Sequence, residues 1–267
     1  MPNPLRRDYD DHRVGAVTRS FLAFLTFAVG VAVCGCGLGR PQVTRVHARP
    51  AAPTIAIEPG AHPLGLGAAR LPGFGRRDGT LYLPRSAASR PLVPLLVLLH
   101  GGGGRETDFR FTFPLAEEFG VAILTLDARD NTWDAVDSPW GPDVLFIDEA
   151  LRHTFERVAV DPRRVGIGGM SDGGFYALSL GISNGDLFTH LVAVAPGWVA
   201  PPAPPIGRPR IFVAHGTRDN VYSVAGSRDR VVPQLKSAGY DVTFREFDGP
   251  HFLLPATTRE VLAWLVS

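Results

Sequence analysis

Seven short apolar runs recur after residue 78, and they constrain the fold of this chain more than any other feature of its sequence. Several of them are continuous rather than alternating, which is typical of strands buried on both faces of a parallel sheet. The runs are TLYLP (80–84), PLLVLL (94–99), VAILTLD (121–127), VGIGGM (165–170), LVAVAP (191–196), RIFVAH (210–215) and DVTFREF (241–247).

Helix-like segments lie between these runs, at residues 143–158, 175–180, 224–235 and 259–265. Strands that alternate with helices predict an α/β fold with a doubly wound, mostly parallel sheet. Ligands of such sheets bind at the carboxyl ends of the strands, so functional residues are expected in the loops that follow the strands.

Residues 168–178 are GGMSDGGFYAL and contain a G-x-S-x-G pattern centred on Ser171. The pattern follows a predicted strand and precedes a predicted helix, which is the setting of a nucleophile elbow. The glycines at 169 and 173 would let the strand and the helix approach closely. The alternative is a glycine-rich turn with an incidental hydroxyl, since the chain has 30 glycines.

A nucleophilic serine needs a general base, and the base needs a carboxylate to orient it. Asp219 follows the predicted strand that ends near residue 214, and His251 follows the last predicted strand. The chain order Ser, Asp, His is that of α/β-hydrolases. Asp229, within a helix-like segment, and Asp248, three residues before the histidine, are the rival acids.

A glycine turn, His100 followed by four glycines, ends another predicted strand. Its backbone N–H groups are suited to bind an oxyanion, and it lacks the Lys-Ser/Thr ending of a phosphate-binding loop. We assign the predicted oxyanion hole to the N–H groups of Gly102, with Gly103 as its neighbour, and of Asp172.

Residues from about 78 to 267 resemble the serine α/β-hydrolases of the phospholipase/carboxylesterase type and their polyhydroxybutyrate-depolymerase-like relatives. The resemblance rests on LLHGGGG, GGMSDGGFYALSLG, FVAHGTRDNVYS and FDGPH. It implies an α/β-hydrolase fold, a triad of Ser171, Asp219 and His251, and cleavage of a small or lipid-like ester through an acyl-enzyme, with no cofactor or metal. Asp172 departs from the Gln, Asn or Ala that often follows the serine in these relatives. A carboxylate there would disfavour anionic acyl groups if it faced the pocket.

Two loops are expected to shape substrate choice. Residues 197–208 are too few to form a cap domain, so we expect an open site. Three of the four tryptophans, Trp133, Trp140 and Trp198, lie in this loop and in residues 128–142. They are predicted to form an aromatic wall for an acyl or aryl group, the alternative being that they pack the loops down.

Residues 1–38 have the pattern of an export signal, because arginines at 6, 7, 13 and 19 precede an uncharged apolar run over 21–38. The 18 residues of the run also reach the lower limit for a retained membrane anchor. The run ends in VCGC, which resembles a lipoprotein cleavage box with Cys36 as the lipidated residue. We therefore expect a periplasmic or extracellular protein, membrane-tethered if Cys36 is lipidated.

Residues 39–75 are predicted to be a Pro/Gly-rich, solvated linker, and residues 76–267 the catalytic domain. The linker prediction depends on six prolines in 40–74, which interrupt any helical or alternating pattern.

The net charge and the spacing of cysteines and histidines bear on which classes of function remain possible. A net charge of +1 gives no support for nucleic-acid binding, and no Cys/His spacing indicates a metal site. Two alternatives to an esterase remain: a peptidase or acyltransferase with the same triad, and a tethered binding protein with a degenerate hydrolase fold. Nothing in the sequence indicates an oligomeric state.

Overall fold

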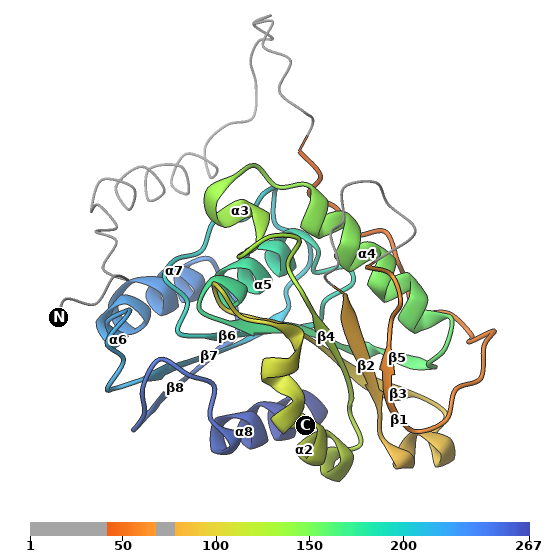
Figure 1. The fold of residues 1–267 in the computed structure, drawn as a ribbon. Helices are drawn as coiled ribbons and strands as arrows, with labels where there is room; N and C mark the ends of the chain where they lie inside the picture. Colours follow the sequence, from red (N-terminus) through yellow and green to blue (C-terminus); the bar gives the residue numbers. More distant parts are fainter. Residues whose placement is uncertain (1–41, 68–77) are drawn as a thin grey trace, which may run out of the picture. The chain divides into compact units, whose positions relative to one another are not determined.

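The computed structural model describes residues 42–67 and 78–267, and within these ranges eight strands form one sheet (Figure 1). The strand order is β1-β2-β4-β3-β5-β6-β7-β8. The bounds are β1 (Gly60–Pro63), β2 (Gly79–Leu83), β3 (Val93–Leu99), β4 (Ala122–Leu126), β5 (Val160–Met170), β6 (His190–Val194), β7 (Arg210–Gly216) and β8 (Val242–Phe247). The pairs from β4 to β8 are parallel, and β1 and β2 add an antiparallel edge. The predicted doubly wound, mostly parallel sheet is confirmed.

Helices cover both faces of the sheet. Figure 1 shows α3 (Asp134–Asp137), α4 (Pro142–Phe155), α5 (Asp172–Ser183), α6 (Val224–Gly226) and α7 (Val232–Ser237) on one face, and α2 (Phe113–Phe119) and α8 (Pro255–Val266) on the other. Short helical turns complete the set: η1 (Arg85–Ser89), η2 (Glu106–Thr112) and the π-helical η3 (Ser227–Val231).

The central strand β3 shows why the strands are continuous apolar runs. All seven of its residues are buried. Leu95, Val97 and Leu99 belong to the core under α4 and α5, whereas Leu96 and Leu98 belong to the core under α2 and α8. Successive side chains of a strand point to opposite faces, so a strand between two helical layers needs apolar residues at every position.

The segment before β2 differs from the prediction. Val46 is fully buried, and its backbone N–H donates to the Asn184 side chain at 2.9 Å. Leu64 and Leu66 are also buried in the core, and β1 pairs with β2. The predicted solvated linker over 39–75 is therefore wrong for residues 42–67, which pack in the same compact unit as the sheet. Prolines prevent helix but not extended chain, and Pro63 lies at the end of an edge strand, where a missing N–H is tolerated.

Residues 197–208, between β6 and β7, form no helix or strand, so no cap domain is inserted there, as predicted. In the described ranges, no helix combines the length and the apolar character that crossing a membrane requires. The predicted signal over 1–38, including Cys36, lies outside the described residues.

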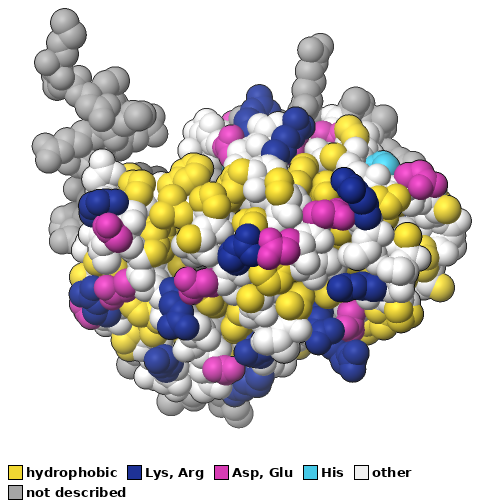
Figure 2. Space-filling view, turned by 90° about the horizontal axis from the view of Figure 1, so that it is seen from below, with side chains coloured by type: hydrophobic (Ala, Val, Ile, Leu, Met, Phe, Trp, Pro, Cys, Tyr) yellow, Lys and Arg dark blue, Asp and Glu magenta, His cyan; other side chains and the backbone are white. Residues whose placement is uncertain are grey.

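Charges of both signs intermingle on the face that carries α2 and α8 (Figure 2). Ion pairs on and beside these helices join Arg259 to Glu118 and Arg245 to Glu260, the second at 3.2 Å. On this face basic side chains do not gather into the patch that a polyanion would need.

Candidate active site

Ser171 lies between β5 and α5 in a strained backbone conformation, with φ 55° and ψ −121°. A positive φ is uncommon for a residue with a side chain, and such strain costs about 1–3 kcal/mol. The surrounding structure holds it: the Ser171 N–H donates to the Val194 carbonyl in the neighbouring strand at 2.9 Å. This is the backbone that the predicted elbow requires.

The two glycines of the elbow are required by close packing. A Cβ on Gly173 would lie 2.1 Å from the Leu99 carbonyl oxygen, and one on Gly169 would lie 2.5 Å from the backbone of Gly173. The end of β3 therefore presses against the elbow. A Cβ on Gly101 would lie 3.3 Å from the Cβ of Ser171, so the glycine turn after β3 borders the serine.

Asp219 and His251, the predicted acid and base, are hydrogen-bonded to each other. The Nδ1 of His251 lies 2.6 Å from Oδ2 of Asp219. A carboxylate only accepts, so Nδ1 carries the proton and Nε2 keeps the lone pair that a general base needs. The other oxygen, Oδ1, accepts the backbone N–H groups of Val221 at 2.8 Å and Tyr222 at 2.9 Å.

The rival acids lie elsewhere. Asp248 is exposed and pairs with Arg218 at 3.2 Å, and Asp229 is exposed in η3. Ser171, Asp219 and His251 follow β5, β7 and β8, whose carboxyl ends share one edge because β5 to β8 are parallel.

The glycine turn offers fewer oxyanion donors than predicted. Gly103 has φ 74°, and its N–H donates to the Asn131 carbonyl at 2.8 Å. That N–H is committed to the loop, so Gly103 is the wrong assignment. Gly102 and Asp172 remain predicted donors. They are neighbours, since a Cβ on Gly102 would lie 2.7 Å from Oδ2 of Asp172.

Trp133 supports the turn rather than a substrate. Its side chain is fully buried, and its Nε1–H donates to the His100 carbonyl at 2.8 Å. A buried indole needs such a partner, and the carbonyl of the turn provides it. The prediction that Trp133 lines the pocket is therefore wrong. The adjacent Thr132 donates its hydroxyl to Oδ2 of Asp172 at 2.7 Å, so the same loop also holds the start of α5.

Trp140 and Trp198 are half-buried and pack against α5. The ring of Trp140 lies 4.5 Å from that of Tyr176, and the ring of Trp198 lies 4.4 Å from that of Phe175. Whether they also contact substrate stays a prediction.

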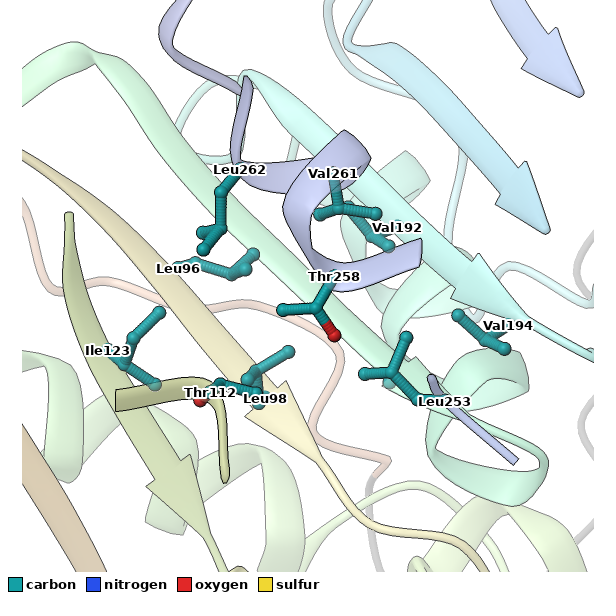
Figure 3. Close-up of a pocket in the computed structure, with 11 residues that line it drawn as sticks. Leu96, Leu98, Thr112, Ile123, Val192, Val194, Leu253, Thr258, Val261 and Leu262 are labelled. Carbon is teal, nitrogen blue, oxygen red and sulfur yellow. The ribbon is translucent and has the colours of Figure 1, made fainter. Parts of the chain in front are cut away.

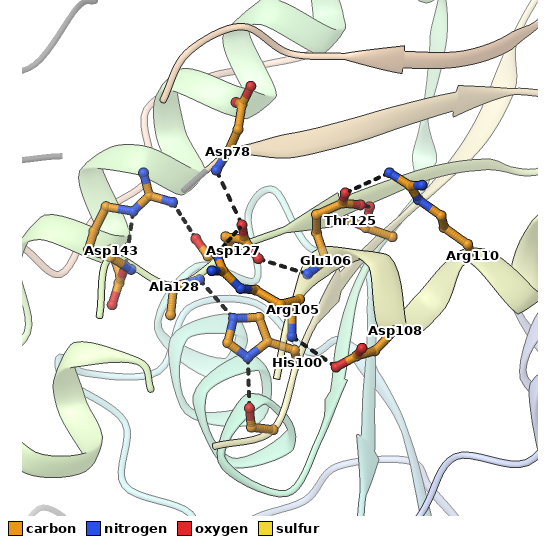
Figure 4. A network of polar contacts seen from close by, with 12 residues as sticks. Asp78, His100, Arg105, Glu106, Asp108, Arg110, Thr125, Asp127, Ala128 and Asp143 are labelled. Atoms are coloured by element: carbon orange, nitrogen blue, oxygen red, sulfur yellow. Dashed lines mark hydrogen bonds and ion pairs between the residues drawn. The ribbon is translucent and has the colours of Figure 1, made fainter. Parts of the chain in front are cut away.

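A polar network, which the sequence did not reveal, holds the other side of the glycine turn (Figure 4). The Nδ1–H of His100 donates to the Gly101 carbonyl at 2.7 Å, while its Nε2 accepts the Ala128 N–H at 3.0 Å. Beside it, Asp127 accepts the backbone N–H of Glu106 at 2.8 Å and pairs with Arg105 at 3.4 Å. The turn is thus fixed to the end of β4, which favours a preorganised site.

Two carboxylates, the buried Asp143 and the half-buried Asp134, close the loop of residues 128–142. Asp143 accepts the N–H groups of Arg129 at 2.7 Å and Asp134 at 2.8 Å, and Tyr176 donates its hydroxyl to Asp134 at 3.0 Å. Burial, together with the neighbouring Asp134 charge, raises the pKa of Asp143 to about 7. Burial also raises the pKa of Asp134.

Solved structures share this architecture. S-formylglutathione hydrolase FrmB of Staphylococcus aureus has a TM-score of 0.60 and 17% identity, with 79% of this chain and 98% of that chain covered. The butyrate-bound esterase Est2 of Thermogutta terrifontis has a TM-score of 0.57 and 18% identity, with 78% and 94% covered. The chain has the α/β-hydrolase fold.

Sequence comparison adds a distant relative of this chain. The protein named "Putative esterase NocK", from Nocardia uniformis subsp. tsuyamanensis, is 30% identical in an alignment of 137 residues that covers 47% of this chain and 40% of that protein. The chain thus matches about two fifths of the length of this curated relative. No protein-family model matches the chain.

Exposed apolar side chains lie beside Asp219 and His251 in the chain. Val221 is 60% exposed beside Asp219, and Phe252 is 44% exposed beside His251. The ring of Phe111 lies 6.2 Å from that of Phe252, and the ring of Tyr222 lies 5.6 Å from that of His251. An exposed apolar rim at a polar site is suited to an apolar substrate.

The interior offers no substrate site near α8. A cavity of about 10 Å³ lies between the sheet and α8, lined by apolar side chains with Thr112 and Thr258 (Figure 3). Its volume is at the lower limit for one water molecule.

Proposed function

We propose that this protein is a serine esterase that cleaves carboxylic esters with Ser171 as nucleophile, His251 as general base and Asp219 as the orienting acid. One observation carries the proposal: the strained Ser171 elbow lies at the same sheet edge as an imidazole–carboxylate pair 2.6 Å apart. The esterase names of the structural relatives and of NocK support it.

The proposed reaction follows from which of these groups can donate a proton and which can accept one. Nε2 of His251 takes the proton of the Ser171 hydroxyl as Oγ attacks the ester carbonyl carbon. The carbonyl oxygen becomes an oxyanion, which the N–H groups of Gly102 and Asp172 stabilise. When the intermediate collapses, the C–O bond to the alcohol breaks and the leaving alkoxide takes the proton from His251. Water then repeats the sequence on the acyl-enzyme, which releases the acid and restores Ser171.

We infer an uncharged, apolar ester as substrate. The exposed Val221 and Phe252 would contact its acyl or alcohol group, and the Asp172 carboxylate would repel an anionic one. The butyrate bound to the Thermogutta terrifontis esterase is in keeping with a short aliphatic acyl group.

Hydrolysis of p-nitrophenyl esters from acetate to decanoate tests the proposal with the full chain. We expect Ser171→Ala to lose at least about 1,000-fold in kcat, while Ser89→Ala, at an exposed serine, matches the wild type. Equal turnover by wild type and Ser171→Ala would refute the assignment. Fluorophosphonate labelling of Ser171 without ester turnover would instead favour a peptidase or acyltransferase.

We further propose that the protein acts outside the cytoplasm, which the basic and apolar pattern of residues 1–38 supports. Labelled palmitate should enter the wild type in a bacterial host but not Cys36→Ala. Equal incorporation in both would refute lipidation at Cys36.

A further inference from the structure

A second histidine contacts the acid of the proposed triad. His215, at the end of β7, is fully buried, and its Nε2 lies 3.0 Å from Oδ2 of Asp219. The same nitrogen lies 3.0 Å from the Tyr222 carbonyl, and Nδ1 lies 2.8 Å from the hydroxyl of the buried Ser227. The mechanism above gives this imidazole no part.

The partners of His215 determine where its proton lies. Both neighbours of Nε2, a carboxylate and a carbonyl, only accept, so Nε2 carries the proton. The Ser227 hydroxyl can then donate to Nδ1, and a neutral ring satisfies every contact. Ser227 therefore stabilises the tautomer whose N–H faces the Tyr222 carbonyl and Asp219.

Asp219 contacts three donors and the second imidazole. Oδ1 accepts two backbone N–H groups, from Val221 and Tyr222, and Oδ2 accepts the N–H of His251. The Nε2–H of His215 donates to the Tyr222 carbonyl, and Nε2 lies at the same 3.0 Å from Oδ2 of Asp219. His215 belongs to a buried strand, so it holds Tyr222 and the Asp219 carboxylate from a support that is independent of the loop carrying His251.

We propose that His215 is a positioning residue of the triad, which fixes the Asp219 carboxylate through the Tyr222 backbone and by contact with Oδ2, and thereby fixes the plane of the His251 ring. The proposal rests on the esterase function proposed above. Small errors in the placement of a general base lower the rate of the chemical step more than substrate binding. The loss should therefore fall on kcat.

Two substitutions separate the N–H donor from the volume of the ring. His215→Leu removes the donor, whereas His215→Gln can place its amide N–H near the position of Nε2. With p-nitrophenyl butyrate, we expect His215→Leu to lower kcat about 10- to 100-fold with KM within about twofold, and His215→Gln to recover most of the loss. Equal losses in both, or an unchanged kcat in folded His215→Leu, would overturn the proposal.

Ser227→Ala is the second test if His215→Leu does not fold. It removes only the partner that selects the tautomer, so a decrease of about 3- to 10-fold in kcat at unchanged KM is expected. No decrease in kcat would overturn the proposal.

The low-field proton NMR signal of His251 Nδ1–H, bonded to Asp219, tests positioning without turnover. We expect it in the wild type and in His215→Gln, and shifted or broadened in His215→Leu. If the wild type hydrolyses no ester, the proposed function fails, but the NMR signal still tests the role of His215. An unchanged signal in folded His215→Leu would overturn that role, and a changed signal would support it.

Discussion

The carboxylate of Asp172 lies against Gly102, beside the predicted oxyanion hole, and it accepts the Thr132 hydroxyl at 2.7 Å. Its negative charge therefore lies beside a predicted oxyanion donor, one residue after the proposed nucleophile Ser171. At a few ångströms from a partly exposed group, such a charge contributes about 1 kcal/mol or more. Asp172 should therefore discriminate between substrates by charge.

Asp172→Asn is expected to raise kcat/KM for an anionic ester, p-nitrophenyl succinate, about fivefold to tenfold relative to p-nitrophenyl butyrate, because it removes the repulsion. Thr132→Val is the matched control, since it removes the hydrogen bond and keeps the charge, and it should leave the ratio unchanged. An unchanged ratio in Asp172→Asn would mean that the carboxylate does not act on the substrate.

Single residues also show what the sequence could and could not reveal. Ser171, Asp219 and His251 could be chosen because each follows a strand, and parallel topology brings strand ends to one edge. The direction of a loop side chain has no such rule. The sequence therefore placed Trp133 in the pocket, whereas its indole points inward and donates to the His100 carbonyl. For the same reason the sequence could not predict the hydrogen bond from the Gly103 N–H to the Asn131 carbonyl.

At the scale of elements, the elbow depends on close contact between β3, β5 and α5. A methyl group on Gly173 would lie 2.1 Å from the Leu99 carbonyl oxygen, whereas one on Gly174 would come no closer than 3.1 Å to its neighbours. The two adjacent glycines thus differ sharply in the space around them.

We expect Gly173→Ala to lower the free energy of unfolding by about 3 kcal/mol or more, or to prevent folding, because backbone atoms have to move. Gly174→Ala should cost less, since its contacts are tight but can relax. Urea unfolding monitored by tryptophan fluorescence measures both. Equal stabilities would contradict the packing described for the elbow.

The strands that the sequence predicted and the segment that it missed differ in their pattern of apolar residues. Strands β3, β4 and β6 were recognisable because burial on both faces produces continuous apolar runs, whereas the edge strand β8 has no buried residue and was recognised by its alternation. Residues 42–67 carry no such run. They use separated apolar side chains, such as Val46 and Leu64, and backbone hydrogen bonds to distant groups, so their composition resembled a solvated tether.

Val46→Asp tests whether this segment is structural. A carboxylate at a fully buried position should lower the free energy of unfolding by about 3 kcal/mol or more, whereas Ala52→Asp, at an exposed position, should change it by less than about 0.5 kcal/mol. Thermal unfolding of the two variants beside the wild type provides the comparison. Two equally small effects would restore the tether interpretation.

At the scale of the whole molecule, the buried Asp143, next to the half-buried Asp134, couples stability to pH. The pKa of Asp143 is about 7 in the folded protein, above the value of about 3.9 for an unfolded chain. At pH values between these two pKa values, the Asp143 carboxyl is protonated in the folded protein and ionised in the unfolded chain. The contribution of Asp143 to stability therefore falls as pH rises from about 4 to about 7, and it is constant above that range.

Comparison with Asp143→Asn isolates this contribution, because asparagine does not titrate. We expect the free energy of unfolding of the wild type, relative to the variant, to decrease by about 2 kcal/mol between pH 5 and pH 8. Urea unfolding at several pH values measures it. A difference that stays flat or increases with pH would show that Asp143 is ionised throughout this range.

Mass spectrometry of the full chain after reaction with a fluorophosphonate tests most directly whether these parts form one catalytic site. The account predicts a single adduct on the peptide containing Ser171, absent from Ser171→Ala and much slower to form in His251→Ala. Failure of the folded wild type to react, or an adduct that persists in Ser171→Ala, would contradict it.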